Sequence, residues 1–387
     1  MKINVFLILS FVIFIQGLSA QSLSDIYRKG TVKLIADREY GRDNNWEKVF
    51  ESYYDTIYNR PMGNRKSIVM LPDQSIVVSH EYRNLYSLFG PDGKFVREFS
   101  LTGISGKPLK KTNKIKGVIG NHFFTGLDNL GRMMCFDFEG RYVKTLTLDY
   151  MAKDMIPLTD DKIAVVGWAI WKDKFRDFVA LVDYQTNEQK IIWDHFSKPN
   201  GSWRPAYDYT SPKIAFLDSQ LIVALPQNGE IMTFDLEGRL ITKDHIEWES
   251  RYMSVEEQKK SARKSYEILA KNKPVNLSGE FLKKVNDYIE KIILPFKLPA
   301  FLTIIKDSDN NLLFFEIPEK EEANIFHVRT CDAKRQFIAQ SSFECEEYNL
   351  SITSDKMIFH EGFIYALQVL KNSEGNPLRL VRFKLSD

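Results

Sequence analysis

The sequence predicts an all-β fold, a six-bladed β-propeller of four-stranded antiparallel blades, with a helical insertion between blades 4 and 5. Two observations predict this fold. A hairpin motif recurs along the chain at nearly constant spacing, and a second strand pair precedes each copy. Four short strands repeated every ~40–50 residues are typical of propellers, because each blade covers its hydrophobic faces only with its ring neighbours.

The first 20 residues have the pattern of a secretory signal peptide. Lys2 precedes an apolar run from Ile3 to Ile15, and the small residues Ser19 and Ala20 follow. The run is shorter than the ~20 apolar residues that cross a membrane. No cysteine lies near Ala20 to carry a bacterial lipid anchor. We therefore expect residues 1–20 to be removed and the protein to be secreted or periplasmic, with no membrane span.

Residues 21–60 form a leader that we expect to contain the ring-closing strand. The alternating stretch GTVKLIA, residues 30–36, is well placed to complete the blade that ends at Leu385. In a propeller the last blade must meet the first, and a strand from the other terminus can supply that contact. Residues 61–387 then form the propeller; seven blades or an open sandwich are the alternatives.

The recurring hairpin motif places a turn glycine between two strands. Its copies are FGPDGKFVRE, CFDFEGRYVKTL and FDLEGRLITK, at residues 89–98, 135–146 and 234–243. A degenerate copy has Asn187 in place of the glycine, so that Gly93, Gly140, Asn187 and Gly238 lie 47, 47 and 51 residues apart. Glycine and asparagine both tolerate positive φ, which tight hairpin turns require. We expect the substitution at Asn187 to keep the turn geometry.

A second strand pair precedes each of these hairpins. In the first unit KSIVMLPDQSIVVSH has a Pro72-Asp73 turn between two β-branched runs, which makes four strands with the hairpin that follows. Comparable units begin near residues 113, 153, 211, 299 and 348.

With these motifs the chain resembles the six-bladed NHL/TolB-like propellers, in particular exported bacterial six-bladed β-propeller proteins. The LPDxS strand and the F-x-x-(D/E)-G-(K/R) alternation carry the resemblance over nearly the whole mature chain. These motifs predict the architecture of the blades and do not indicate a chemical activity. The chain departs from a regular member by its degenerate third and fifth turns and by the insertion at residues 250–298.

The insertion is predicted to be helical. Ser254 and Glu257 fit a capping box, and Val285, Ile289 and Ile292 belong to an apolar face at helical spacing. Lysine and arginine residues make its first half basic. We expect a solvated helix pair packed over the propeller; a lid or a partner-docking arm is the alternative.

Charge and cysteine content exclude some classes of function. The formal net charge of +2 argues against a nucleic-acid partner. The three cysteines lack metal-ligand spacing. Cys135 is expected to be a core residue. A Cys331–Cys345 disulfide is permitted in an oxidising compartment, although strand register does not place the two opposite each other.

No motif of nucleophilic, metal-dependent or phosphate-transfer catalysis appears in the sequence. We therefore expect a binding protein without a cofactor rather than an enzyme. The resemblance implies one alternative, a calcium-dependent lactonase- or esterase-like hydrolase with an ion in the central channel. Calcium needs six to eight oxygen ligands, and the candidates are Asp128, Asn129, Asp173 and Asn228.

The remaining functional signal is aromatic. In blade 3 the stretches 167–177 and 194–210 are predicted to be long loops that leave one face of the propeller together. Exposed aromatic side chains stack on sugar rings or anchor peptides, because they bury much area at low entropic cost. The predicted ligand-binding residues are Trp168, Trp171, Arg176, Trp203, Arg204, Tyr207 and Tyr209. Packing of these rings on one another, to order the loops, is the alternative.

We therefore expect a monomeric, secreted propeller that binds a ligand or protein through loops of blades 3 and 4 and the helical insertion. The expected partner is a glycan, a peptide or an envelope protein. The alternatives are the calcium-dependent hydrolase and a structural component of an envelope assembly.

Overall fold

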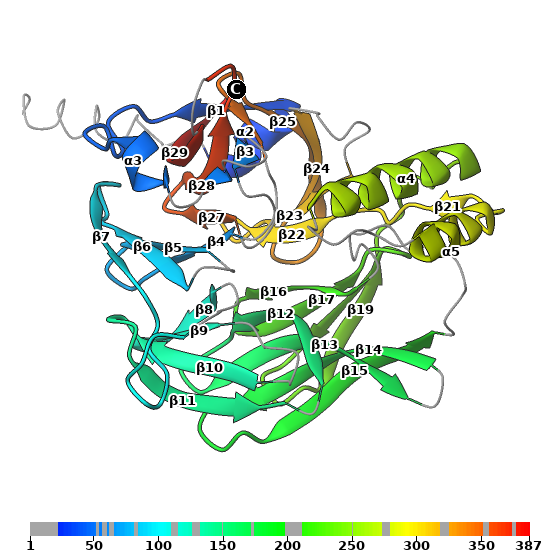
Figure 1. Cartoon of the computed structure of the whole chain (residues 1–387), viewed down its shortest axis with the longest axis horizontal. Coiled ribbons are helices and arrows are strands. Elements are labelled where there is room, and N and C mark those ends of the chain that lie inside the picture. The colour runs from blue at the N-terminus through cyan, green and yellow to red at the C-terminus, as the bar shows by residue number, and fades with distance from the viewer. Residues whose placement is uncertain are drawn as a thin grey trace, which may run out of the picture.

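The computed structural model of the chain describes residues 22–51, 54–55, 60–61, 66–80, 84–109, 115–125, 132–148, 150–171, 174–197, 211–249, 251–272, 279–317, 325–350, 356–373 and 377–387. This part is dominated by antiparallel β-sheets (Figure 1). No helix in it combines the length and the apolar character that crossing a membrane requires.

Four separate sheets follow one another along the chain, each a meander of four strands. The first contains β4 (Lys66–Met70), β5 (Ile76–His80), β6 (Leu85–Phe89) and β7 (Phe95–Phe99). The second contains β8 (Ile115–Ile119), β9 (His122–Thr125), β10 (Arg132–Asp137) and β11 (Tyr142–Thr147). The third contains β12 (Met151–Pro157), β13 (Lys162–Trp171), β14 (Lys174–Asp183) and β15 (Gln189–Ser197). The fourth contains β16 (Lys213–Leu217), β17 (Gln220–Leu225), β18 (Glu230–Phe234) and β19 (Leu240–His245).

A nine-stranded sheet holds the last part of the chain and one early strand. Its first half is β22 (Thr303–Lys306), β23 (Leu312–Phe315), β24 (Ile325–Cys331) and β25 (Phe337–Glu344). Its second half is β1 (Thr31–Ala36), β29 (Leu378–Ser386), β28 (Phe363–Leu370), β27 (Met357–His360) and β26 (Tyr348–Asn349). Two short pairs complete the β-structure: β2 (Tyr54–Asp55) with β3 (Arg60–Pro61), and β20 (Tyr252–Met253) with β21 (Phe296–Lys297).

The first strand of each group lies on a closed circle. β4 contacts β8, β8 contacts β12, β12 contacts β16, β16 contacts β22, β22 contacts β27, and β27 contacts β4 again. Figure 1 shows these strands around the middle of the molecule. The core lies between neighbouring groups; Phe123 of the second sheet, for example, stacks on Tyr86 of the first at 6.3 Å between ring centroids. This arrangement is that of a β-propeller, so the predicted all-β architecture of four-stranded antiparallel sheets is confirmed.

The recurring turn residue has positive φ in every copy, as predicted. Gly93, Gly140 and Gly238 have φ of 79°, 84° and 72°, and Asn187 has φ of 63°. The turns at Gly140, Asn187 and Gly238 also pack on the preceding sheet, whereas the Gly93 turn packs on Tyr40 and Gly41. A Cβ at Gly238 would lie 2.3 Å from Ile192 Cγ2 on the outer strand of the third sheet, whereas the Asn187 amide donates to the Thr147 carbonyl of the second sheet at 3.1 Å. The motif recurs because its turn makes the packing contact between neighbouring sheets.

The N-terminal segment binds the end of the chain. β1 pairs antiparallel with β29, with Leu34 opposite Leu385, and parallel with β25, which merges the last two strand groups into one sheet. Helix α2 (Leu23–Arg28) precedes β1 and packs against β25. Buried Tyr27 of α2 donates a hydrogen bond to Asp307 at 2.9 Å, a residue 280 positions later. The N-terminal segment thus ties the two ends of the described chain together.

Helices α4 (Val255–Asn272) and α5 (Gly279–Glu290) lie between β20 and β21, at one side of the ring in Figure 1. The predicted capping box is formed: Glu257 accepts from the Ser254 amide at 2.8 Å, and Ser254 Oγ accepts from the Glu257 amide at 3.2 Å. Val285 and Ile289 of the predicted apolar face pack on Ala262 of α4. A further short helix, α3 (Trp46–Val49), follows β1.

All three cysteines are buried and free. Cys331 belongs to the cluster between the fourth sheet and β22–β24, whereas Cys345 packs beneath β1 and α2. The disulfide that the compartment permitted is therefore not formed, because the two residues occupy different hydrophobic clusters.

Candidate functional site

Hydrogen bonds between turns define one face of the ring. The turns that follow the first strands meet there: Asn310 donates to Asp218 at 3.3 Å, the Gly362 amide to Ser308 at 2.8 Å, and Gln74 to Glu361 at 3.4 Å. We call this the first-turn face. Because each sheet is a meander, the second-to-third-strand turns and the links to the next sheet lie on the opposite face. We call that the connection face, and it is the face on which the sequence predicted binding.

The structure corrects the predicted loop at residues 167–177. β13 and β14 remain paired as far as Trp171 opposite Lys174, and β15 continues beside β14 to Ser197. Residues 167–171, 174–177 and 194–197 are therefore strand. Residues 167–171 are a continuous apolar run that extends β13, and β14 is paired on both sides, with β13 and with β15.

The predicted binding residues that the structure describes have separate roles. Arg176 donates to Asp194 through Nε at 2.9 Å and Nη2 at 2.5 Å, and its guanidinium lies 5.3 Å from the Phe196 ring centroid. Trp168 lies beside Lys153, whose ammonium is 6.0 Å from the indole ring. Trp171 lies at the end of β13. The others, Trp203, Arg204, Tyr207 and Tyr209, lie outside the described residues.

Near Trp168, a half-buried polar cluster links two sheets. Lys153 donates to Asp177 of the third sheet at 2.9 Å and to Ser211 at 2.7 Å, just before β16. The side chains of Lys153 and Asp177 are 22% and 12% exposed, so their charges are poorly screened by solvent. The Lys153–Ser211 bond links the starts of β12 and β16 at the connection face, and Asp177 fixes the lysine within the third sheet.

The central channel is mostly apolar. A cavity of about 420 Å³ lies between the first strands of all the groups, and its lining is mainly aliphatic side chains, with Lys116 and Lys306 as the charged ones. At the connection face Lys66 starts β4, and burial together with the nearby Lys356 lowers the pKa of Lys66 to about 7. The charged side chains of the described lining are thus lysines, whereas calcium requires six to eight oxygen ligands.

The structure describes one of the four calcium candidates, Asn228. Asp128, Asn129 and Asp173 lie outside the described residues, and the Asn228 side chain accepts from the Glu230 amide at 3.1 Å as a local turn bond. Within the described ranges, no three His, Cys, Asp or Glu side chains are close enough to hold one ion.

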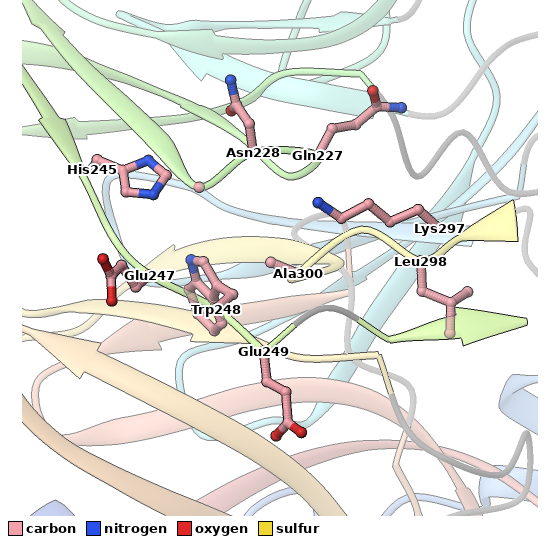
Figure 2. Close-up of a pocket in the computed structure, with 10 residues that line it drawn as sticks. Gln227, Asn228, His245, Glu247, Trp248, Glu249, Lys297, Leu298 and Ala300 are labelled. Carbon is pink, nitrogen blue, oxygen red and sulfur yellow. The ribbon is translucent and has the colours of Figure 1, made fainter.

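A second cavity, of about 350 Å³, lies on the connection face where the fourth sheet meets the chain around the helices (Figure 2). Three segments form it: the 226–229 turn between β17 and β18, residues 245–249 at and after the end of β19, and residues 297–300 after β21. We call it the Trp248 pocket. Figure 2 shows Asn228, His245, Glu247 and the Lys297 ammonium around it, with Trp248 below the 226–229 turn and the Glu249 carboxylate turned away.

Trp248 is held rigidly in this pocket. The Arg329 guanidinium lies 4.2 Å from its ring centroid, and Arg329 Nη1 donates to the Glu247 carbonyl at 2.5 Å. Phe301 and Phe314 pack around the indole at 5.6 and 6.0 Å between centroids. The indole ring is therefore fixed by the core of the neighbouring sheet.

The indole nitrogen of Trp248 is a buried donor that has no hydrogen-bond acceptor within the described chain. The backbone of Gly229 packs on this edge of the ring. A Cβ there would lie 3.1 Å from Trp248 Nε1, 2.7 Å from Cδ1 and 2.2 Å from the Ile246 carbonyl oxygen, so a larger residue would displace the indole. Buried polar groups are almost always hydrogen-bonded, and this donor is an exception within the described chain.

Sequence reasoning missed the Trp248 pocket. The available signal was a tryptophan between two glutamates, Glu247 and Glu249, at the point where the repeat breaks before residue 250. The contacts of Trp248 and Glu247 with Arg329, and the place of Lys297 in the same pocket, depend on the folded arrangement of distant segments.

Comparisons with known proteins give a fold and no family. No protein-family model matches the chain, and no curated protein matches it. A solved structure of a DUF4221 family member from Bacteroides vulgatus is similar, with 13% identity and a TM-score of 0.53 over 93% of this chain and 100% of that one. At this identity the likeness concerns the fold alone.

Two further solved structures are more distant. A putative exported protein from Bacteroides fragilis has 10% identity and a TM-score of 0.48 over 95% of this chain and 98% of that one. A gluconolactonase from Xanthomonas campestris has 12% identity and a TM-score of 0.45 over 83% of this chain and 86% of that one. Both are too distant to bear on function.

Proposed function

We propose that the protein is an exported six-bladed β-propeller that acts as a binding module through its connection face, with the Trp248 pocket as its centre. The closed circle of first strands supports six blades, the nine-stranded sheet counting as two blades joined by β1. The signal-peptide pattern at residues 1–20 supports export, with residues 21–60 as leader and 61–387 as propeller.

One observation carries the binding function: a cavity of about 350 Å³ on the connection face, lined by amide, carboxylate, imidazole and ammonium side chains around the fixed Trp248. Cavities of at least ~300 Å³ with a few convergent polar groups are the usual form of small-ligand sites. The cavity adjoins the helical insertion at residues 250–298, where the chain departs from its repeat. The predicted residues of the third blade, Trp168 and Trp171 among them, lie on the same face and are proposed to extend the contact.

The test is a binding panel of envelope glycans and peptides with the wild type, Trp248→Ala and Trp193→Ala. Trp193 is a half-buried tryptophan on β15, outside the pocket, and serves as the matched control. We expect Trp248→Ala to abolish binding and Trp193→Ala to retain it. Equal binding by all three proteins would refute the assignment of the site, and a wild type that binds nothing on the panel would refute the binding function.

A second candidate function, docking of an envelope protein, is favoured by exposed apolar residues beside the helices. Ile293 and Leu294 are 76% and 72% exposed, and Tyr252 of the adjoining β-pair is 59% exposed. Exposed large apolar side chains that lie together mark interaction surfaces. Co-purification of one stoichiometric envelope protein with the wild type, lost in Ile293→Asp, would support this function.

A further inference from the structure

The central channel is a candidate for a second binding site, which goes beyond the proposed function and does not depend on the Trp248 pocket. We propose that the channel binds an aliphatic carboxylate, such as a medium-chain fatty acid. Its hydrocarbon chain lies between the first strands, and its carboxylate meets Lys116 towards the connection face.

The first step concerns the wall of the channel. The cavity of about 420 Å³ has the size of a small-ligand site. Among the described residues that line it, none has a hydroxyl, amide or carboxylate side chain, so a ligand with many polar groups would lose its hydrogen bonds to water there. A ligand of largely apolar character therefore fits this wall best.

The same wall has apolar surface that a ligand would cover. Although the first strands lie around the middle of the molecule (Figure 1), several of their apolar side chains stay partly exposed because they border the cavity. These side chains are Val69, Met70, Val118, Ile156, Phe216 and Ile358. A hydrocarbon chain in the cavity would remove their surface from water, which is favourable.

The second step concerns charge along the channel. Each first strand runs from the connection face to the first-turn face. Near the connection face lie Lys66, Lys116, Lys153 and Lys213, with Lys356 directly before β27, whereas the turns at the other end contain Asp73, Asp161, Asp218, Asp309 and Glu361. On the described first strands, Asp154 is the one carboxylate beside these lysines. A channel that is basic at one end and acidic at the other directs an anionic group to its basic end.

The third step concerns the lysine that reaches the cavity at this end. Lys116 lines the cavity, and its ammonium donates to the Lys153 carbonyl at 3.3 Å. An ammonium has three donors, so Lys116 can donate to a ligand carboxylate as well. Lys306, the other charged lining residue, ends β22 directly before the turn that contains Asp309. The carboxylate therefore lies at Lys116, and the chain extends towards the first-turn face.

The test is isothermal titration calorimetry with decanoate, octanoate, 1-decanol and decyltrimethylammonium, all below their micelle concentrations. We expect saturable binding of one decanoate per protein, tighter than that of the neutral and cationic probes with the same chain. Because each buried methylene strengthens binding about four-fold, decanoate should bind about 15-fold more tightly than octanoate.

Two variants test the two parts of the site. Lys116→Gln keeps a donor for the Lys153 carbonyl and removes the charge, so its affinity for decanoate should fall about ten-fold. Val118→Phe enlarges a half-buried lining side chain near the end of β8, so decanoate should lose its advantage over octanoate. Lys33→Gln and Val143→Phe change exposed residues outside the channel and should retain wild-type affinities.

Several results would overturn the assignment: 1-decanol or decyltrimethylammonium binding as tightly as decanoate, full affinity in Lys116→Gln, or an intact advantage of decanoate in Val118→Phe. Ile293→Asp changes the exposed apolar surface beside the helices and should also retain decanoate binding. A loss of binding in Ile293→Asp would place the chain outside the channel and would overturn the proposal too. Unchanged thermal unfolding of Lys116→Gln keeps the test valid even if Val118→Phe does not fold.

Discussion

Replacement of Tyr27 by Phe tests how the N-terminal segment closes the ring. The Tyr27 ring is fully buried, and its hydroxyl donates to Asp307 Oδ2 at 2.9 Å across 280 positions of sequence. Phenylalanine keeps the packing and removes only this bond. Asp307 keeps three donors, the amides of Asp309 and Asn311 and the Asn311 side chain, at 2.8–2.9 Å.

A hydrogen bond to a charged acceptor contributes about 1.5–3 kcal/mol to stability. At roughly 2 °C per kcal/mol for a chain of this size, Tyr27→Phe should lower Tm by about 3–6 °C. Tyr142→Phe is the control, because the Tyr142 hydroxyl meets only Thr145, three residues away, at 3.1 Å and in a partly buried position. Scanning calorimetry of both variants measures the difference.

The effect of Tyr27→Phe should also depend on pH. Burial raises the pKa of Asp307, against the opposing effect of hydrogen bonds from Asn311 and Tyr27. A carboxyl whose folded-state pKa is raised contributes stability that is present below its unfolded pKa and is lost as pH rises through the folded one. Loss of the Tyr27 donor raises the folded pKa further, so the cost of the substitution should shrink on acidification. If Tyr27→Phe is no less stable than Tyr142→Phe, or if its loss of stability grows at low pH, this reasoning is refuted.

Three further predictions follow from named contacts. Gly229→Ala should lower Tm and weaken binding of the panel ligand, because its Cβ would collide with Trp248 and the Ile246 carbonyl. Gly106→Ala, at a similar φ of 70° but with nothing within 4 Å, should only lower Tm slightly; equal effects of the two variants in calorimetry and titration would contradict the account of the pocket wall. Asp37→Asn should cost about 2 kcal/mol, because Asp37 accepts from Arg382 Nε and Nη2 at 3.0 and 2.6 Å. Burial raises the pKa of Asp37, but the hydrogen bond from Arg382 and its charge outweigh this effect and lower that pKa. The Asp37 carboxylate should therefore stabilise the fold above its unfolded-state pKa, and this stabilisation should disappear as pH falls through its folded-state pKa. Urea unfolding at several pH values checks this sign. Thiol titration in denaturant without reductant should find three free cysteines. A count of only one free cysteine would show that the other two form a disulfide.

The sequence predicted the repeat well because its signal is local. A turn that needs positive φ selects Gly140 or Asn187 wherever it occurs, and its spacing then reports the period. The capping box at Ser254 and Glu257 is local in the same sense. The stretch GTVKLIA was also placed correctly beside Leu385, because the end of a circular fold leaves few possible partners for an alternating strand.

For the candidate site, the sequence predicted only the face of the ring on which it lies. The sequence predicted a loop at residues 167–177, but β13 and β14 remain paired through this stretch and β15 continues beside β14. Arg176 is bound to Asp194. The Trp248 pocket depends on Arg329, which comes from β24 and lies 82 positions from its acceptor Glu247. Contacts over such separations leave no periodic trace in the sequence, so the pocket could be found only in the folded chain.

The central claim, that a ligand binds on the connection face at the Trp248 pocket, is tested most directly by hydrogen–deuterium exchange. The measurement compares the free protein with protein saturated by the member of the glycan and peptide panel that binds most tightly. The account predicts slowed exchange at residues 226–229 and 245–249, with no change at the 71–75 and 361–362 turns of the first-turn face. Protection confined to those turns, or none at 226–229 and 245–249, would contradict it.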